Sequence, residues 1–161
     1  MLGLGSNLGK KSQNLCDALK RISTFCKIIK TSSVYKTASL LRDGQGAYFN
    51  MCAYVSTYME PDELLAALKQ IEKAMGRENT GRWYTRVIDI DIIDLNNAAY
   101  SSDRLNLPHP QMGVRSFVLY PLREILPSYV HPVSCLSIDN MVKMIRDDLG
   151  IQKLGVALWQ L

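Results

Sequence analysis

The chain has 161 residues, of which 47% are hydrophobic and 21% charged, and its formal net charge is +4. This composition is typical of a soluble globular protein, and the length supports one hydrophobic core but not two, so residues 1–161 are predicted to form one domain. No apolar run approaches the ~20 residues that cross a bilayer, which excludes a helical membrane protein, while the basic excess favours an anionic partner.

Hydrophobic spacing and turn residues predict the secondary structure in chain order. We expect a strand over residues 1–4, a turn over 5–9 and a helix from 12 to about 25, followed by strands over 27–35 and 49–58 that are joined by a loop over 39–47. Next come a helix from 61 that ends at Gly76, a polar segment over 77–85 and a strand over 87–95. A loop near His109 and helices over 117–125 and 139–148 complete the predicted order. This order favours an α+β sandwich over an alternating α/β fold.

The N-terminus lacks a charged segment followed by an apolar one, so we expect a cytoplasmic protein with no membrane partner. The four cysteines, Cys16, Cys26, Cys52 and Cys135, form no C-x-x-C pair of the kind found in zinc knuckles and redox motifs. We expect all four to be reduced, buried thiols.

Two aspartates in the isoleucine-rich segment 87–95 are the first candidates for chemistry. Because side chains alternate along a strand, Asp89 and Asp91 are predicted to point the same way, with isoleucines on the opposite face. Paired carboxylates suit hard Mg²⁺, which also takes phosphate oxygens. A solvent-facing strand with two aspartates and no ligand is an equal alternative for so short a pattern.

Basic residues flank this pair in the sequence. Arg77, Arg82 and Arg86 precede it, and Arg104, His109 and Arg115 follow a loop later. Each arginine alone is more typical of a solvated surface, but carboxylates for metal beside arginines for phosphate indicate a polyphosphate site. The sequence contains no G-x-x-x-x-G-K-[ST] loop, so side chains would have to hold ATP.

Aromatic residues suggest a place for a flat ring. Tyr48 and Asn50 share one face at the start of a predicted strand, and Trp83 lies in the polar segment before the aspartates. Periodicity alone also fits Tyr48 and Phe117 as ordinary half-buried aromatics, and Trp83 as an anchor for its loop.

These residues occur in a pattern that resembles the 6-hydroxymethyl-7,8-dihydropterin pyrophosphokinases of folate biosynthesis, from Gly3 to about Val130. The most specific match is RWYTRVIDIDI at 82–92, which is similar to the family's R-W-G-P-R-x-L-D-x-D-I. Supporting matches are GSNL at 5–8, SVYKT at 33–37, YFN at 48–50, IE at 71–72, GR at 76–77, LPH at 107–109 and RSF at 115–117.

The resemblance implies a ferredoxin-like α+β sandwich and an ATP-dependent diphosphotransferase, with two Mg²⁺ ions on Asp89 and Asp91. Catalytic roles fall to Arg77, Arg86, Asp89, Asp91 and His109. The pterin would contact Gly5, Thr37, Leu40, Tyr48, Asn50, Trp83, Asp89 and Phe117, and the nucleotide would contact Glu72, Arg82, Trp83, Arg86, Ile92, Arg104, His109 and Arg115.

The chain departs from the family pattern where Ala38-Ser39 replaces a proline pair, Tyr84-Thr85 replaces Gly-Pro, and Pro110 replaces an aromatic after the histidine. The family resemblance also implies that the domain can be fused to dihydropteroate synthase. Two other function classes are alternatives. Single-stranded RNA binding is disfavoured because two aspartates would face an anionic backbone, and the second class is a homologue that binds its ligands without catalysis.

Overall fold

The computed structural model describes residues 1–38, 46–76, 86–146, 148–155 and 158–159. Its elements, in chain order, are β1 (Leu2–Ser6), α1 (Lys11–Ile22), β2 (Lys27–Thr31), β3 (Tyr35–Thr37), β4 (Tyr48–Ser56), α2 (Pro61–Ala74), β5 (Asp89–Ile92), β6 (Tyr100–Ser101), β7 (Asn106–Leu107), the 3₁₀ turn η1 (Met112–Val114), α3 (Ser116–Ile125), α4 (Ile138–Lys143) and β8 (Gln152–Lys153).

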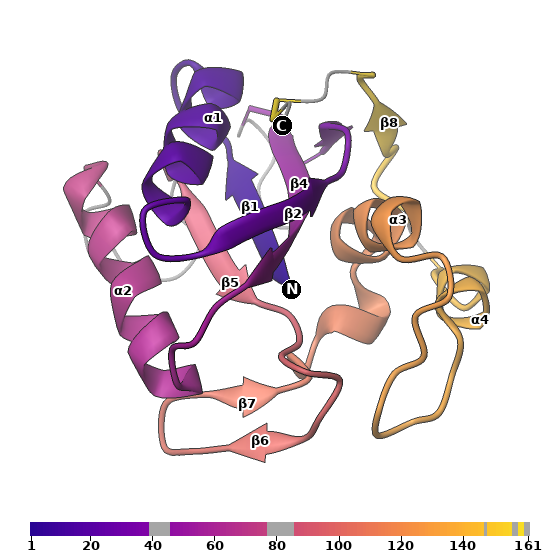
Figure 1. Cartoon of the computed structure of the whole chain (residues 1–161). Coiled ribbons are helices and arrows are strands. Elements are labelled where there is room, and N and C mark those ends of the chain that lie inside the picture. Colours follow the sequence, from indigo (N-terminus) through magenta and orange to yellow (C-terminus); the bar gives the residue numbers. More distant parts are fainter. Residues whose placement is uncertain (39–45, 77–85, 147, 156–157, 160–161) are drawn as a thin grey trace.

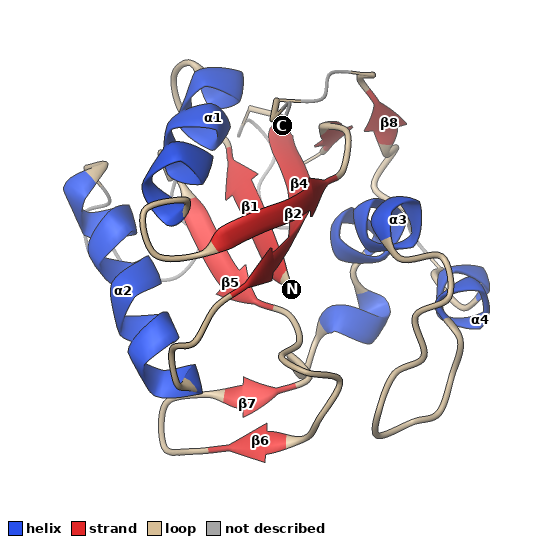
Figure 2. Ribbon diagram, in the orientation of Figure 1, coloured by secondary structure: helices blue, strands red, loops and turns tan. Residues whose placement is uncertain are grey.

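The main sheet is antiparallel, with strand order β5-β1-β4-β3-β8, and β2 also pairs with β4 (Figure 2). Strands β1, β2, β4 and β5, with α1 and α2 between them, form the β-α-β-β-α-β arrangement of the ferredoxin-like fold. The predicted α+β sandwich is therefore confirmed. The strand order places β1 between β5 and β4, so that these two strands pair with opposite edges of β1.

Two hydrophobic cores, and not the single core expected from the chain length, lie on opposite faces of this sheet, because helices cover both faces. Helices α1 and α2 cover one face, and α3 covers the other, with α4 packed against α3 (Figure 1). The first core contains Leu4, Leu19 and Leu68, and the second contains Cys52, Leu119 and other residues of the α3 side. Alternate residues of β1, β4 and β5 therefore face different helices, which makes the side-chain register of the strands strict.

The predicted strand over residues 27–35 is in fact two strands, β2 and β3. Ser32 interrupts it, because the Cys52 amide donates to the Ser32 hydroxyl at 2.9 Å instead of to a carbonyl of the ladder. The Ser32 amide still donates to the Cys52 carbonyl at 2.9 Å. A side-chain oxygen thus takes the place of one main-chain acceptor and ends the regular pairing.

The predicted strand over 87–95 is also too long, since β5 spans Asp89–Ile92. Beyond Ile92, the Ile93 and Asp94 amides both turn toward the single carbonyl of Met1, at 2.9 and 3.4 Å, and this double contact breaks the alternation of a strand. The first strand is longer than predicted, reaching Ser6, and the last helix is shorter, ending at Lys143.

The helix predicted from residue 61 is α2, which has Pro61 at its first position and ends before Gly76. Gly76 adopts a φ of +88°, the left-handed conformation that favours glycine after a helix.

The prediction of four buried thiols is wrong for Cys135, which is exposed, and Cys16 is only partly buried. No helix in the described part of the chain is both long enough and apolar enough to cross a membrane.

Candidate active site

Two carboxylates project from the same face of β5. Asp89 and Asp91 alternate with buried isoleucines, and their own side chains remain 27% and 36% exposed. The predicted side-by-side placement of the two aspartates is confirmed. Across the antiparallel pairing, Asp89 lies opposite Gly5 and Asp91 lies opposite Gly3, so no side chain of β1 separates them from β4.

The main chain of Gly5 forms a bare surface between the aspartates and β4. Gly5 pairs with both Asp89 and Asn50, and a Cβ atom at position 5 would lie 3.0 Å from Asn50 Oδ1. Asn50 and Thr37 are buried, and Asn50 Nδ2 donates to Thr37 Oγ1 at 3.0 Å. This contact fixes the amide orientation and leaves Oδ1 directed over the glycine.

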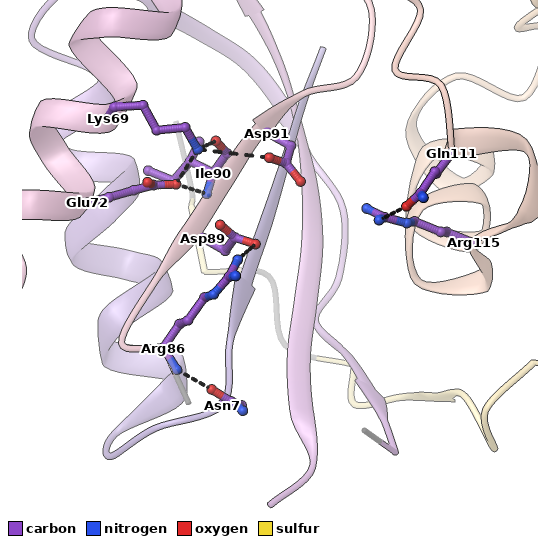
Figure 3. Close-up of polar contacts among 9 residues, drawn as sticks. All are labelled: Asn7, Lys69, Glu72, Arg86, Asp89, Ile90, Asp91, Gln111 and Arg115. Atoms are coloured by element: carbon purple, nitrogen blue, oxygen red, sulfur yellow. Dashed lines mark hydrogen bonds and ion pairs between the residues drawn. The ribbon is translucent and has the colours of Figure 1, made fainter. Parts of the chain in front are cut away.

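Helix α2 covers the outer edge of β5. Glu72, only 2% exposed, accepts a hydrogen bond from the Ile90 amide at 2.7 Å, and Lys69 donates to the Ile90 carbonyl at 3.2 Å and to Glu72 at 2.9 Å. Lys69 Nζ also lies 4.0 Å from Asp91 Oδ1 (Figure 3). Peptide groups alternate in direction along a strand, so the N–H and C=O groups of Ile92 face the same outer edge of β5 as those of Ile90, two residues earlier. The Ile92 side chain itself is buried.

Arg86 approaches the aspartates from the segment before β5. Its Nη1 lies 2.8 Å from Asp89 Oδ2, and both side chains are about one quarter exposed, at 24% and 27%. The main chain of Arg86 is held by Asn7: the Arg86 amide donates to Asn7 Oδ1 at 2.6 Å, and the Asn7 amide donates to the Arg86 carbonyl at 3.2 Å. The turn after β1 therefore fixes the point from which this arginine reaches Asp89.

His109 lies beside the same carboxylates, although eighteen residues or more separate it from them in sequence. Its amide donates to the carbonyl of Ile93 at 2.8 Å, just beyond the end of β5. Burial lowers the pKa of His109, and the nearby charge of Asp91 opposes that shift. The His109 imidazole is thus predominantly neutral at pH 7, and it lies near enough to Asp91 for the carboxylate charge to influence its protonation.

Arg115 extends toward the aspartates from the start of α3 (Figure 3). Burial lowers the pKa of its guanidinium, and the charges of Asp91 and Asp89 act in the opposite direction. The Arg115 Nη2 donates to the side-chain carbonyl of Gln111, which fixes the direction of the guanidinium. Its Cζ lies 5.5 Å from the centroid of the Phe117 ring, a cation–π distance.

Tyr48 and Phe117 come from different elements, the first residue of β4 and the first turn of α3, and both are half-buried. Burial raises the pKa of Tyr48, while the charge of Arg86 opposes the shift, so the phenol lies within electrostatic reach of that arginine. Each aromatic therefore lies beside one arginine of the site. Stacking of a ligand between the two rings stays a prediction.

The structure does not bring every predicted residue to the aspartates. Arg104, in the β6–β7 hairpin, is 67% exposed and its Nε lies 4.0 Å from Asp62 at the start of α2. Four predicted residues, Leu40, Arg77, Arg82 and Trp83, lie outside the described residues.

Three residues that help to position the site are not predicted from the sequence: Asn7, Lys69 and Gln111. Lys69 carried a detectable signal, because it precedes Glu72 by three residues and so shares its helix face. Asn7 belongs to the GSNL match, but nothing in the sequence pairs it with Arg86. Gln111 is placed by a loop contact that has no sequence signature.

In the described part of the chain, cations approach the carboxylate pair from three elements: Lys69 from α2, Arg86 from the segment before β5, and Arg115 from the start of α3. Cations at these distances neutralise carboxylates in the absence of ligand and offer donors to phosphate oxygens. The described residues contain no cluster of three or more His, Cys, Asp or Glu side chains that would enclose a metal ion by themselves. The arrangement therefore suits an anionic ligand that brings part of a metal's coordination with it.

Comparison with known proteins identifies the family. The sequence model described as 7,8-dihydro-6-hydroxymethylpterin-pyrophosphokinase (HPPK) matches residues 1–127. A 2-amino-4-hydroxy-6-hydroxymethyldihydropteridine pyrophosphokinase from Haemophilus influenzae is 38% identical over 148 residues, covering 91% of this chain and 92% of that protein. The corresponding Aquifex aeolicus protein is 36% identical over 132 residues, 82% of each chain.

Longer proteins also match. The folic acid synthesis protein FOL1 of Dictyostelium discoideum is 42% identical over 140 residues, which are 87% of this chain but only 21% of that protein. The crystal structure of wild-type Plasmodium falciparum HPPK-DHPS with SDX-DHP superposes on 88% of this chain and 42% of its own, with a TM-score of 0.71 and 19% identity, a likeness that shows the fold.

The match over most of the chain, the bacterial relatives of similar length and the shared fold agree with the resemblance noted in the sequence. The chain belongs to the 7,8-dihydro-6-hydroxymethylpterin-pyrophosphokinase family.

Proposed function

We propose that the chain transfers pyrophosphate from ATP to the hydroxymethyl oxygen of 6-hydroxymethyl-7,8-dihydropterin, giving the pterin diphosphate and AMP for folate biosynthesis. The observation that carries the proposal is the convergence of Asp89, Asp91, Arg86, His109 and Arg115, from three separate segments, in a member of this family. ATP is the co-substrate that a kinase of this family implies.

Asp89 and Asp91 are proposed to hold Mg²⁺, two ions in the filled site. The donor set fits: both are carboxylates, hard oxygen ligands, and both remain partly exposed on one face of β5. Magnesium is typically bound by one or two carboxylates plus substrate phosphates, so two aspartates suffice when ATP supplies the remaining oxygens. When bound, Mg²⁺ supplies neutralisation of the charge on the transferring phosphates.

Arg86, Arg115 and His109 are proposed to contact the phosphates. Arg86 forms an ion pair with Asp89, and Arg115 is oriented by Gln111 while directed at the same carboxylates. Phosphate oxygens would take over these guanidinium donors once a cation neutralises the aspartates. The neutral imidazole of His109 has one N–H to donate to an oxygen at pH 7 without adding a positive charge.

Glu72, Ile92 and Arg104 are proposed to serve the nucleotide from the β5 edge and the β6–β7 hairpin. The main-chain groups of Ile92 face the outer edge of β5, where a base could take the place of a paired strand. Glu72 already accepts a hydrogen bond from the Ile90 amide, so its first role is to hold the outer edge of β5 in position.

The pterin is proposed to lie on Gly5, where the absence of a side chain permits a flat ring to approach the main chain. Asn50 Oδ1 lies over this glycine as an acceptor for ring N–H groups, and its Nδ2 is already occupied by Thr37. Tyr48 and Phe117 would supply the aromatic faces on either side of the ring.

In the proposed reaction the pterin hydroxymethyl oxygen forms a bond to the β-phosphorus of ATP, and the bond from that phosphorus to the oxygen shared with the α-phosphate breaks. AMP leaves with that oxygen, and the hydroxyl proton is released. Arg86 and His109 are the protein donors placed to stabilise the charge that develops on the departing oxygen.

Phosphorus NMR of the pterin product tests the reaction type. A diphosphate on the pterin gives two coupled phosphorus signals, and ATP is converted to AMP in equal amount. A single phosphorus signal on the pterin, with ADP formed, would show monophosphate transfer and would refute the proposal.

A further inference from the structure

Asn7 occupies the turn after β1 and is 5% exposed. Both hydrogen-bonding groups of the Arg86 main chain contact it: the amide donates to Asn7 Oδ1 at 2.6 Å, and the carbonyl accepts from the Asn7 amide at 3.2 Å. This pair of contacts fixes the main chain of Arg86 beside the turn after β1. From that fixed point the Arg86 guanidinium reaches Asp89 at 2.8 Å.

The other half of the Asn7 amide, its Nδ2, takes no part in the contacts with Arg86. Its Nδ2 is buried and has no hydrogen-bond partner among the described residues. Buried amide donors are nearly always paired in folded proteins, so an exception calls for a function. The Asn7 side chain lies close enough to the Tyr48 hydroxyl to act on it as a hydrogen-bonding group, which opposes the rise that burial causes in the pKa of Tyr48, but Nδ2 is short of full hydrogen-bond geometry here.

Main-chain proximity points to the same neighbour. A Cβ atom at Gly46, two residues before Tyr48, would lie 3.9 Å from the Asn7 carbonyl oxygen. Asn7 thus lies between the segment that carries Arg86 and the segment that carries Tyr48, and its two side-chain atoms are directed to different segments. The proposed function assigns Arg86 to the phosphates and Tyr48 to the pterin.

We propose that Asn7 is a positioning residue for the transfer: its Oδ1 holds Arg86 on the phosphate side, its Nδ2 donates to the Tyr48 hydroxyl when the pterin is bound, and the rigid amide joins the two. This inference rests on the proposed function. A planar amide has an acceptor and a donor in fixed relative positions, which a hydroxyl or a carboxylate at position 7 would not reproduce.

Asn14 offers a matched control because it braces the same junction without reaching either residue. Its Nδ2 donates to Leu8 O at 2.8 Å, to Ser6 Oγ at 3.1 Å and to Val87 O at 3.1 Å. Loss of Asn14 therefore loosens the turn and the segment after Arg86, while the two contacts of Asn7 remain. A merely structural role for Asn7 predicts that the two variants behave alike.

The experiment compares Asn7→Ala with Asn14→Ala by thermal unfolding, by pterin affinity and by the single-turnover rate of AMP formation at saturating MgATP. We expect similar losses of thermal stability, but a fall of about tenfold or more in single-turnover rate for Asn7→Ala alone, the size of coupling seen between residues in contact. Equal kinetic losses in both variants would overturn the inference.

A double-mutant cycle gives the readout that a structural role would not move. With pterin and MgATP both saturating, so that the contact with Tyr48 does not limit binding, Asn7→Ala added to Arg86→Ala should lower the single-turnover rate less than about twofold further, because Asn7 then acts on the rate through Arg86. Independent effects would multiply. Multiplied losses would refute the coupling. Should Asn7→Ala fold poorly, Asn7→Asp keeps the acceptor for Arg86 and removes the donor near Tyr48, so it should weaken pterin binding while Tyr48→Phe adds no further loss.

The outcomes separate the inference from the proposed function. If the unaltered protein forms no AMP and no pterin diphosphate, the proposed function fails and the inference fails with it. If the unaltered protein is active but the cycles show independent losses, the inference alone is wrong.

Discussion

Asp91→Asn is the substitution that most sharply separates the catalytic part of the site from the fold. The Asp91 carboxylate is 36% exposed, and Lys69 Nζ, on a side chain that is itself 43% exposed, lies 4.0 Å away. An ion pair so exposed contributes about 0–1 kcal/mol to stability, and the amide is isosteric, so the free energy of unfolding should change by less than about 1 kcal/mol.

The expected effect on turnover is far larger. A metal ion that neutralises transferring phosphates contributes several kcal/mol to the transition state, and at about 1.36 kcal/mol per tenfold a loss of ~4 kcal/mol lowers the rate roughly 10³-fold. The assay is the initial rate of AMP formation across a magnesium titration, together with chemical denaturation of each variant without ligands.

Asp139→Asn is the matched control, since Asp139 is 52% exposed and pairs with Arg123 Nε at 2.7 Å on the α3–α4 side. It should change neither turnover nor magnesium dependence. A rate for Asp91→Asn within tenfold of the unaltered protein, or a loss of stability large enough to unfold it, would refute the assignment of Asp91 to metal.

Three further predictions concern other parts of the site and fold. Tyr48→Ala should weaken pterin binding much more than ATP binding in calorimetric titrations, because only the flat ring stacks on it; equal losses would count against the pterin assignment. Glu72→Ala should lower the free energy of unfolding by about 1.5–3 kcal/mol in urea denaturation, because it removes the charged acceptor of the buried Ile90 amide, and a change below ~0.5 kcal/mol would contradict that role. Burial alone would raise the pKa of Glu124, but hydrogen bonds from Tyr35 and neighbouring groups lower it below its ordinary 4.5. The unfolded chain therefore binds the proton more readily, so stability should fall as the pH drops below about 4.5, and Glu124→Gln should lose most of that pH dependence; an unchanged slope would show that other groups cause it.

The part of the site that could be predicted from sequence is the part governed by a short period. Alternation along β5 is enough to place Asp89 and Asp91 on one face and the isoleucines on the other, and the structure confirms it. The spacing of apolar residues from Leu64 to Ile71 likewise identifies α2 and its buried face. Both are local properties of the chain, decided by residues within two or four positions of one another.

What could not be predicted depends on contacts between distant segments. Nothing near Asn7 in the sequence indicates that its side chain binds the main chain 79 residues later. The length of β5 is set by the single carbonyl of Met1, and the gap between β2 and β3 by the Ser32 hydroxyl. In each case a side chain or a chain end competes with the regular ladder, and strand propensity does not register such competition.

The roles given to His109 and Arg115 required both kinds of information. The sequence suggested a polyphosphate site from their type and order, and the fold brings them within electrostatic reach of Asp91. For Arg104 the same type and order predict a nucleotide contact, which stays a prediction, and in the structure its Nε lies 4.0 Å from Asp62.

The central claim is that this member of the family transfers pyrophosphate to a pterin. The most direct test is to mix the protein with MgATP, with and without 6-hydroxymethyl-7,8-dihydropterin, and to separate AMP from ADP by chromatography over time. We expect AMP to form only when the pterin is present, in a one-to-one ratio with consumed pterin. ADP as the nucleotide product, or no nucleotide turnover in the presence of pterin, would contradict it.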